Sequence, residues 1–256
     1  MLLASWNINS IRAREERFFA WLEARRPDVL CLQELKCTQE QFPFERVKAL
    51  GYDVAVFGQK TYNGVAILSK TPIANLRLGL ADGGDEHGAR VISAIVSGVR
   101  VVNVYVVNGQ VVGSDKWAAK LEWMKRLRAY LDRNHKPDEP LVLCGDFNVA
   151  PDERDVDRPD AWAPSVLFHP EVRELLRQIA GFGLEDTFRL HEQGAGFYSW
   201  WDYRKLSFPK NDGLRLDLVF ATAPLAKRCS AAAIERNERK GQQPSDHVPV
   251  LATFDL

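Results

Sequence analysis

The feature that most constrains the fold is the number of short apolar runs rich in β-branched residues. Eight such runs, each bounded by turn-forming residues, are typical of β-strands; they cover residues 2–8, 28–33, 64–69, 91–96, 101–107, 141–144, 216–221 and 250–254. Helical periodicity is found in three stretches, near 13–25, 115–133 and 172–179. Because strands outnumber helices, we predict two β-sheets packed together with helices outside, in preference to a single parallel sheet.

Length and composition place the chain among ordinary globular proteins. Its 256 residues are 46 % hydrophobic and 27 % charged, which excludes a disordered chain, a collagen-like repeat and a small disulfide-rich scaffold. This length allows one large α/β domain or two smaller ones. Since no Pro-, Gly- or Ser-rich linker interrupts the sequence, we expect a single domain over residues 1–256.

Cysteine usage and the N-terminal residues indicate where the protein works. The four cysteines are too few for a disulfide framework, and none has zinc-ligand spacing. The N-terminal residues do not resemble a signal peptide, and no apolar run is long enough to span a membrane. We therefore expect a cytoplasmic protein without a membrane partner, which we take to be monomeric.

Polar residues stand repeatedly at the ends of the predicted strands. They are Asn7, Glu34, Tyr105, Asn108, Asp146, Asn148, Asp217, Asp246 and His247. Singly, each is explained better by a turn, a helix cap or core packing. Together they predict one pocket, because ligands gather at strand ends in α/β proteins.

The chemistry of such a pocket follows from its carboxylates. Four of them, Glu34, Asp146, Asp217 and Asp246, would repel one another unless a cation lay between them. Oxygen ligands suit Mg²⁺ or Mn²⁺ better than zinc. The sequence contains no P-loop, no dinucleotide-binding motif and no zinc-protease motif. A hard cation beside donors such as His247 and Tyr105 is suited to phosphodiester hydrolysis.

Six motifs carry a resemblance that extends over nearly the whole chain. They are W-N-I-N (6–9), L-Q-E (32–34), G-D-F-N (145–148), W-W-D-Y-R (200–204), R-L-D (215–217) and S-D-H (245–247). Together they resemble the exonuclease III family of DNA-repair nucleases and abasic-site endonucleases, in the endonuclease/exonuclease/phosphatase superfamily. The resemblance implies a four-layer α/β sandwich, in which two mixed β-sheets pack face to face with helices outside.

The resemblance also implies a role for each matched residue. Glu34 would be the principal Mg²⁺ ligand (Mn²⁺ being the other candidate), with Asn7 and Asp246 nearby. Asp146, helped by Asn148, would orient or deprotonate the attacking water. Tyr105 would bind a phosphate oxygen. His247, oriented by Asp217, would either hold the phosphate or act as a base, and both roles stay open.

The resemblance also implies residues that would contact DNA. Trp200, Trp201 and Leu214 match positions that wall a pocket for a flipped-out abasic sugar, and Arg204 belongs to the same aromatic and basic segment. Core packing is the alternative for the tryptophans, and we expect it for at least one of the pair. The stretch 152–170 departs from the family pattern, so the contributions of Leu167, Phe168 and His169 stay open.

The net charge of zero, from 34 basic and 34 acidic residues, conceals local clusters. Residues 116–136, which include Lys120, carry a net charge of +5; residues 204–215, which include Arg215, carry +3; and residues 152–160 carry −3. With four acids assigned to one metal pocket, we expect the bases to be free to meet DNA phosphates.

The implied function is a Mg²⁺-dependent phosphodiesterase of base excision repair that acts on double-stranded DNA. It would incise abasic sites, trim 3′ ends from 3′ to 5′ and remove 3′ blocking groups. The main alternative is a 3′-end processing exonuclease or phosphatase with weak or no abasic-site activity. A nucleic-acid-binding regulator without chemistry, and a phosphatase for small or lipid substrates, rank behind both.

Overall fold

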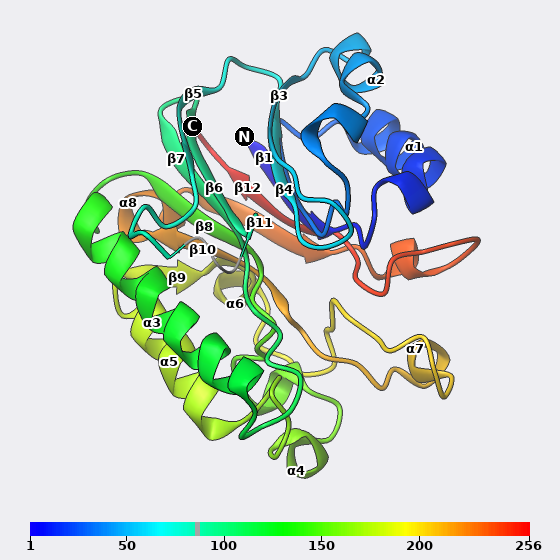
Figure 1. The fold of residues 1–256 in the computed structure, drawn as a ribbon, viewed down its shortest axis with the longest axis vertical. Coiled ribbons are helices and arrows are strands. Elements are labelled where there is room, and N and C mark those ends of the chain that lie inside the picture. Colours follow the sequence, from blue (N-terminus) through cyan, green and yellow to red (C-terminus); the bar gives the residue numbers. More distant parts are fainter. Residues whose placement is uncertain (85–87) are drawn as a thin grey trace.

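The computed structural model describes residues 1–84 and 88–256, and in these residues twelve strands form two six-stranded sheets (Figure 1). The first sheet has the order β11-β12-β1-β2-β4-β3. Its strands are β1 (Leu2–Asn7), β2 (Val29–Gln33), β3 (Asp53–Phe57), β4 (Val65–Ser69), β11 (Cys229–Ile234) and β12 (Val250–Phe254). The second sheet, β5-β6-β7-β8-β10-β9, consists of β5 (Ala74–Leu78), β6 (Val91–Val96), β7 (Val99–Tyr105), β8 (Leu141–Asp146), β9 (Leu184–Asp186) and β10 (Asp217–Thr222).

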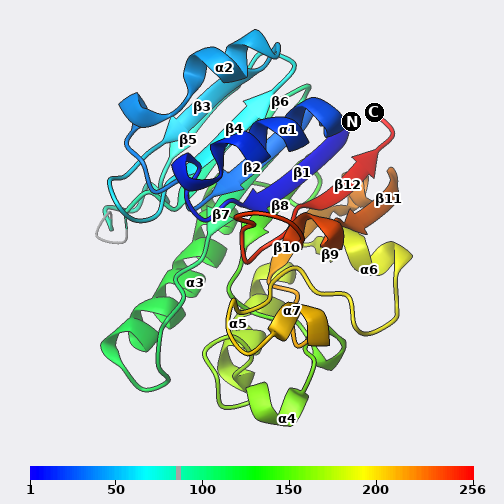
Figure 2. The same cartoon turned by 90° about the vertical axis from the view of Figure 1, so that its right-hand side faces the viewer.

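The longer helices cover the outer faces of the two sheets (Figures 1 and 2). Helices α1 (Glu15–Arg25) and α2 (Phe44–Ala49) lie on the first sheet, and α3 (Asp115–Asn134) and α5 (Pro170–Ala180) lie on the second. The shorter helices are α4 (Pro159–Trp162), α6 (Thr187–His191), α7 (Ser207–Lys210) and α8 (Ala223–Ala226). Single 3₁₀ turns occur at η1 (Arg12–Arg14), η2 (Gln39–Gln41), η4 (Glu153–Asp155) and η5 (Arg236–Arg239).

Alternating side chains of the central strands build three apolar cores. In β1, Leu3 points into the core between the sheets, whereas Ala4 faces α1. In β8, Val142 points into the core between the sheets, and Leu143 faces α3 and α5. Because these strands are buried on both faces, they appear in the sequence as continuous apolar runs. The predicted four-layer α/β sandwich is confirmed.

Each sheet contains one parallel pair near its centre. β1 runs parallel to β2, with Leu3 opposite Val29, and β7 runs parallel to β8, with Arg100 opposite Leu141. All other neighbouring strands in both sheets are antiparallel. The carboxyl ends of the two parallel pairs meet at the same edge of the sandwich, since Asn7 contacts Asp146 there.

All eight predicted strands and all three predicted helices are present, although several of their bounds shift. β7 begins at Val99, two residues before the prediction, and β8 continues to Asp146. The sequence did not reveal β3, β5, β9 and β11, which are short or lie at the sheet edges. Within the described ranges, no helix is long and apolar enough to cross a membrane.

The basic clusters are less free than expected. Lys120 has no exposed surface, Arg126 pairs with Asp82, and Arg128 pairs with Asp132. Arg215 is also buried, and it binds two carboxylates inside the protein. We call this group, which consists of Asp155, Asp186, Arg189 and Arg215, the Arg215 cluster. The expectation that Lys120 and Arg215 meet DNA phosphates is therefore wrong. Lys120 donates its hydrogen bonds to carbonyl oxygens inside the protein, and Arg215 forms ion pairs there.

Candidate active site

Strand ends from both sheets position the catalytic candidates. Asn7 ends β1, Glu34 follows β2, Tyr105 ends β7 and Asp146 ends β8. Gly145 allows this arrangement, because it has a φ of 142° and a Cβ there would lie 1.9 Å from the carbonyl oxygen of Val104. The side chains predicted from separate motifs therefore converge at one edge of the sandwich.

Asn7 bridges two carboxylates, one from each sheet. Its Nδ2 donates to Glu34 Oε1 and to Asp146 Oδ2, each at 2.9 Å. Its Oδ1 accepts the backbone N–H of Asn9 at 3.0 Å. The amide oxygen that the sequence offered as a metal ligand is thus turned away from the carboxylates, because two neighbouring carboxylates require a donor between them.

His247 lies between two aspartates. Its Nδ1 is 2.8 Å from Asp217 Oδ2, and its Nε2 is 3.7 Å from Asp146 Oδ2. The hydroxyl of Ser245 accepts the backbone N–H of His247 and donates to the carbonyl oxygen of Asn7, which fixes this loop against β1. The predicted Asp217–His247 pair is present, with its imidazole facing Asp146.

Burial and mutual charge set the protonation of this cluster. Burial raises the pKa of Asp146 to about 7, and the charge of Asp217 acts in the same direction. Although burial disfavours the imidazolium, Asp217 and Asp146 raise the pKa of His247 to about 10. Against the effect of burial, Lys36 and Asn7 lower the pKa of Glu34. At neutral pH the cluster therefore holds an imidazolium and a carboxyl group poised to exchange a proton.

Tyr105 and Asn148 complete the inner part of the site. The pKa of Tyr105 is raised by burial and by the charges of Glu34 and Asp146, so its hydroxyl stays protonated and can donate a hydrogen bond. The guanidinium of Arg90 lies 4.6 Å from the Tyr105 ring centroid. Asn148 donates through Nδ2 to Asp146 Oδ2 at 3.3 Å. Both side chains therefore hold positions from which they reach the carboxylates.

Asp246 lies at the margin of this group. Its Oδ1 accepts Asn9 Nδ2 at 2.8 Å, and its Oδ2 accepts Trp200 Nε1 at 3.0 Å. Lys36 Nζ contacts both Glu34 Oε2, at 2.8 Å, and Asn9 Oδ1, at 2.6 Å. Neither Asn9 nor Lys36 was predicted as a site residue, although Asn9 belongs to the W-N-I-N motif and Lys36 lies two residues after L-Q-E.

The donor set fits a hard divalent cation. One ligand atom from each of Glu34, Asp146 and His247 lies within 4.8 Å of the others. In the described part of the chain, the buried Asp217 Oδ1 has no hydrogen-bond donor. An excess of acceptors over donors in a buried group favours a bound cation. Asp246 is outside this set, and its two oxygens accept hydrogen bonds from Asn9 and Trp200.

Several of these residues have a left-handed backbone. The φ angles are 51° at Glu34 and at Lys36, 50° at Asn148 and 47° at Asn9. This region is unfavourable for residues with a Cβ, although asparagine tolerates it better than most. Such conformations persist where the surrounding structure enforces them, and they gather at functional sites.

The residues predicted to contact DNA separate into two groups. Trp200 is partly exposed, and its ring centroid lies 6.5 Å from that of His247. Trp201 and Leu214 have no exposed surface, because Trp201 packs against Tyr198 and Leu214 belongs to the core under α3 and α5. Neither of these two therefore walls an open pocket, and Trp201 shows the core packing expected for one of the pair.

Arg204 lies on the surface near this aromatic group. Its side chain is 82 % exposed, and its Nη2 pairs with Asp202 at 2.7 Å. Of the three residues left open, Leu167 lines a hollow of about 340 Å³ with Asn108 and Trp162. Phe168 is buried, and His169 begins α5, accepting the backbone N–H of Glu171 at 3.3 Å.

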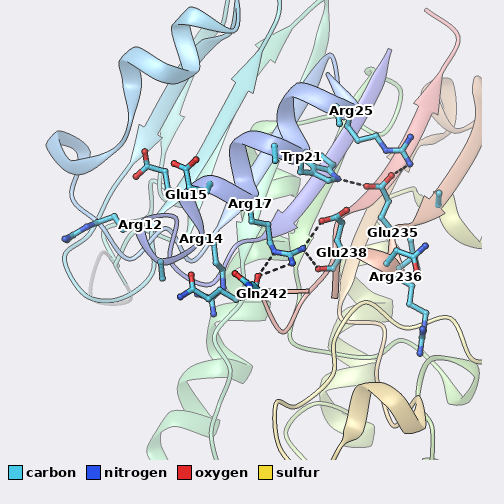
Figure 3. Close-up of a pocket in the computed structure, with 18 residues that line it drawn as sticks. Arg12, Arg14, Glu15, Arg17, Trp21, Arg25, Glu235, Arg236, Glu238 and Gln242 are labelled. Atoms are coloured by element: carbon cyan, nitrogen blue, oxygen red, sulfur yellow. Dashed lines mark hydrogen bonds and ion pairs between the residues drawn. The ribbon is translucent and has the colours of Figure 1, made fainter. Parts of the chain in front are cut away.

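A larger groove of about 1140 Å³ lies between α1 and η5 (Figure 3). Trp21 and Arg25 point from α1 toward Glu235, and Arg17 points toward Glu238 and Gln242. The groove includes none of the catalytic candidates. Two of the five arginines that line it, Arg17 and Arg25, are paired with glutamates.

Comparison with known proteins agrees with this geometry. The model of the Endonuclease/Exonuclease/phosphatase family matches residues 4–247. Exodeoxyribonuclease III of Haemophilus influenzae is 35 % identical over 266 residues, covering 99 % of this chain and 100 % of that protein. The chain belongs to the endonuclease/exonuclease/phosphatase family. It is a nuclease of the exodeoxyribonuclease III type, and the family depends on divalent metal ions.

Solved structures show the same fold over the full length. An AP endonuclease from Archaeoglobus fulgidus superimposes with a TM-score of 0.95 at 36 % identity, and the match covers 100 % of both chains. The 3′ phosphatase NExo (D146N) from Neisseria, bound to a product DNA hairpin, gives 0.94 at 37 % identity, again over 100 % of both chains. Membership of the family and the fold therefore rest on sequence and structure together.

Proposed function

We propose that this protein is a Mg²⁺-dependent DNA-repair phosphodiesterase of base excision repair that acts on double-stranded DNA. It cleaves the phosphodiester 5′ to an abasic site, removes nucleotides from 3′ to 5′ and releases 3′-phosphates and related 3′ blocking groups. The observation that carries the proposal is the meeting of Glu34, Asp146 and His247 between the two sheets. We further propose that it acts as a monomer in the cytoplasm, where its free cysteines stay reduced.

Asp146 acts on the attacking water. Its pKa of about 7 allows the carboxylate to orient the water and accept its proton near neutral pH. Asn7 Nδ2 and the backbone N–H of Asn148 hold the two carboxylate oxygens at 2.9 and 2.8 Å. The hydrogen bond from the backbone N–H of Asn148 fixes the Asp146 carboxylate in one orientation toward the phosphate.

His247 holds the phosphate. With a pKa of about 10, the imidazolium keeps both protons at neutral pH, and Asp217 orients it through Nδ1. The other nitrogen, Nε2, donates to a non-bridging phosphate oxygen, where negative charge develops in the transition state. Tyr105 donates a second hydrogen bond to the same group. A protonated His247 favours this role over that of a base.

Of the three residues that meet here, Glu34 and Asp146 would hold the divalent ion, with Asp246 further out. When bound, the ion neutralises charge on the scissile phosphate. The oxygens of Glu34 and Asp146 prefer Mg²⁺ or Mn²⁺, which is why we propose Mg²⁺. The protonated His247 donates to the phosphate and does not ligate the ion, so Glu34 remains the principal ligand.

Trp200 provides an apolar wall beside His247 for a sugar that has lost its base. Trp162 packs edge-on against Trp200, with ring centroids 6.2 Å apart, and the hollow lined by Asn108 and Leu167 lies alongside. A nucleotide without its base enters such a space more easily than a paired one. Arg204, exposed near this wall, would contact the DNA backbone.

The range of activities is supported by two structures that resemble this chain about equally. One is an AP endonuclease, at 36 % identity, and the other a 3′ phosphatase, at 37 %. We therefore propose both activities here and do not favour the narrower 3′-end enzyme. A regulator without chemistry is disfavoured, because the carboxylates that activate water and bind a cation are all in place.

A substrate panel tests the proposal. Purified protein with Mg²⁺ is given a duplex with an internal tetrahydrofuran, a nick with a 3′-phosphate, and a recessed 3′ end. We expect cleavage of all three, and loss of all three with Glu34→Gln or with EDTA. Failure to incise the tetrahydrofuran duplex would favour the narrower 3′-end enzyme, and failure on every substrate would refute the proposal.

A further inference from the structure

Lys120 lies inside the molecule, directly behind the catalytic residues. It belongs to α3, and its side chain has no exposed surface. Its Nζ donates to the main-chain carbonyl oxygens of Asn108 at 3.0 Å, Asn148 at 2.7 Å and Val166 at 2.7 Å. An ammonium has three protons, so each of them has an acceptor.

The three acceptors lie on three different loops. Asn108 follows β7, Asn148 follows β8, and Val166 precedes α5. Gly109 brings the first loop close to Lys120, because its φ is +90° and a Cβ there would lie 2.9 Å from Lys120 Cδ. One ammonium thus joins the three loops that surround the inner end of the site.

The loop contacts continue to the catalytic carboxylate. Asn108 Nδ2 donates to Asn148 Oδ1 at 2.9 Å, and Asn148 N donates to Asp146 Oδ1 at 2.8 Å. Asn148 itself has a left-handed φ of 50°. Holding its carbonyl oxygen therefore determines where its N–H and side chain point.

Burying this charge is unfavourable for the folded protein. Burial lowers the pKa of Lys120 to about 7, against the opposing charge of Asp146. An apolar side chain of similar length would fill the same space without that penalty, but would leave three carbonyl groups without their donor. The hydrogen bonds to the three loops, and not the packing of α3, therefore explain why an ammonium group stands at this position.

We propose that Lys120 is a positioning residue, which acts through Asn148 to hold Asp146 in the orientation needed for phosphodiester hydrolysis. The proposal rests on the proposed function only in assigning Asp146 its role toward the attacking water. Lys120 does not contact substrate, and it reaches the reaction through the main chain of Asn148.

Steady-state kinetics on the tetrahydrofuran duplex test this with Lys120→Met, and with Lys125→Met as the matched control on an exposed position of the same helix. We expect kcat to fall by about 100-fold in Lys120→Met, because misplacement of a catalytic group by ~1 Å has an effect of this size. KM should change by less than about twofold, because no substrate contact is removed. Lys125→Met should behave as the wild type.

A double-mutant cycle separates positioning from general destabilisation. In an Asp146→Asn background, Lys120→Met should lower kcat by less than about threefold, because the carboxylate that it positions is already gone. An equal loss in both backgrounds would overturn the proposal. Equal changes in KM and kcat would do the same.

Hydrogen exchange gives a readout that does not depend on activity. In Lys120→Met, amide exchange should rise within residues 106–112, 146–150 and 164–168, with the sheets unchanged. Unchanged loops, or a rise throughout the molecule, would overturn the proposal. If Lys120→Met does not fold, Gly109→Ala displaces the loop from Lys120 and should raise exchange in the first of these segments. A wild type inactive on every substrate would refute the proposed function, and hydrogen exchange would still decide the role of Lys120.

Discussion

Two buried polar clusters, one containing Arg215 and the other Asp217, differ in their charge balance although these two residues are only two positions apart. The Arg215 cluster has two carboxylates and two guanidinium groups, and every oxygen of Asp155 and Asp186 accepts at least one hydrogen bond. The catalytic cluster (Asn7, Glu34, Lys36, Asp146, Asp217 and His247) has three carboxylates beside one imidazole and one ammonium. Within the residues described, Asp217 Oδ1 is left without a donor.

The difference shows how to distinguish a structural polar cluster from a functional one. A cluster with balanced charge needs no further ion and holds segments together; here it joins η4, β9, α6 and the segment just before β10. A cluster with excess negative charge needs a ligand, in this case a cation and a phosphate. The two clusters should therefore respond in opposite ways to mutation, cations and pH.

The largest expected effect is the loss of activity in Asp146→Asn. Removing the proton acceptor should lower kcat by on the order of 10²–10⁴-fold. The free energy of unfolding of the metal-free protein should stay the same or rise above pH 7, because one buried charge disappears. Cleavage assays and urea unfolding measure the two quantities. A variant that lost stability and activity together would show that this cluster is structural.

Arg215→Met should produce the reverse pattern. Leaving two buried carboxylates without their shared partner should lower the free energy of unfolding by about 3–5 kcal/mol. Adding Asp155→Leu should recover part of this loss, because an unpaired charge is removed with it. Urea unfolding of both variants tests the prediction, and an unaltered unfolding curve for Arg215→Met would contradict it.

Divalent cations should stabilise one cluster only. At about 100 times its dissociation constant, Mg²⁺ should raise the free energy of unfolding by about 2.7 kcal/mol. This increase should disappear in Glu34→Gln and remain in Glu185→Gln, a surface control. Thermal unfolding with and without EDTA provides the measurement. An equal response to Mg²⁺ in Glu34→Gln would place the ion elsewhere.

The effect that is smallest per pH unit is the pH dependence of stability in the metal-free protein. The pKa of Asp146 is raised to about 7 and that of His247 to about 10, so the folded state binds more protons than the unfolded state between about pH 4 and pH 7 at Asp146 and between about pH 6.5 and pH 10 at His247. Their contribution to stability is present at low pH and lost as pH rises through these two values, by up to about 1.4 kcal/mol per pH unit for each group. Asp146→Asn should flatten the slope measured by urea unfolding between about pH 4 and pH 7.

The parts of the fold predicted from sequence are those buried on both faces. Central strands such as β1 and β8 carry uninterrupted apolar runs, and amphipathic helices such as α5 cover them. The strand β5 was missed because all five of its residues are exposed, and β11 because it is alanine-rich and half exposed. An edge strand is determined by the neighbour it pairs with, which local sequence does not reveal.

The sequence predicted which residues form the site better than it predicted how their side chains contact one another. Strand-end positions identified Asn7, Glu34, Asp146 and His247, because their polarity interrupts apolar runs. Sequence could not show that Asn7 turns its NH₂ toward the carboxylates, or that Lys120 and Arg215 turn inward. A buried basic residue has the same local sequence as an exposed one, and the difference depends on partners far along the chain.

The left-handed residues of the active site have a consequence for how this protein would change under selection. Glu34 and Lys36 adopt a backbone that glycine or asparagine would adopt with less strain. A library selected for thermal stability alone would accumulate these replacements, and the selected variants would be more stable and inactive. Only a screen that requires catalytic turnover in every round would keep an acidic side chain at position 34. Thermal stability and catalysis must therefore be selected together.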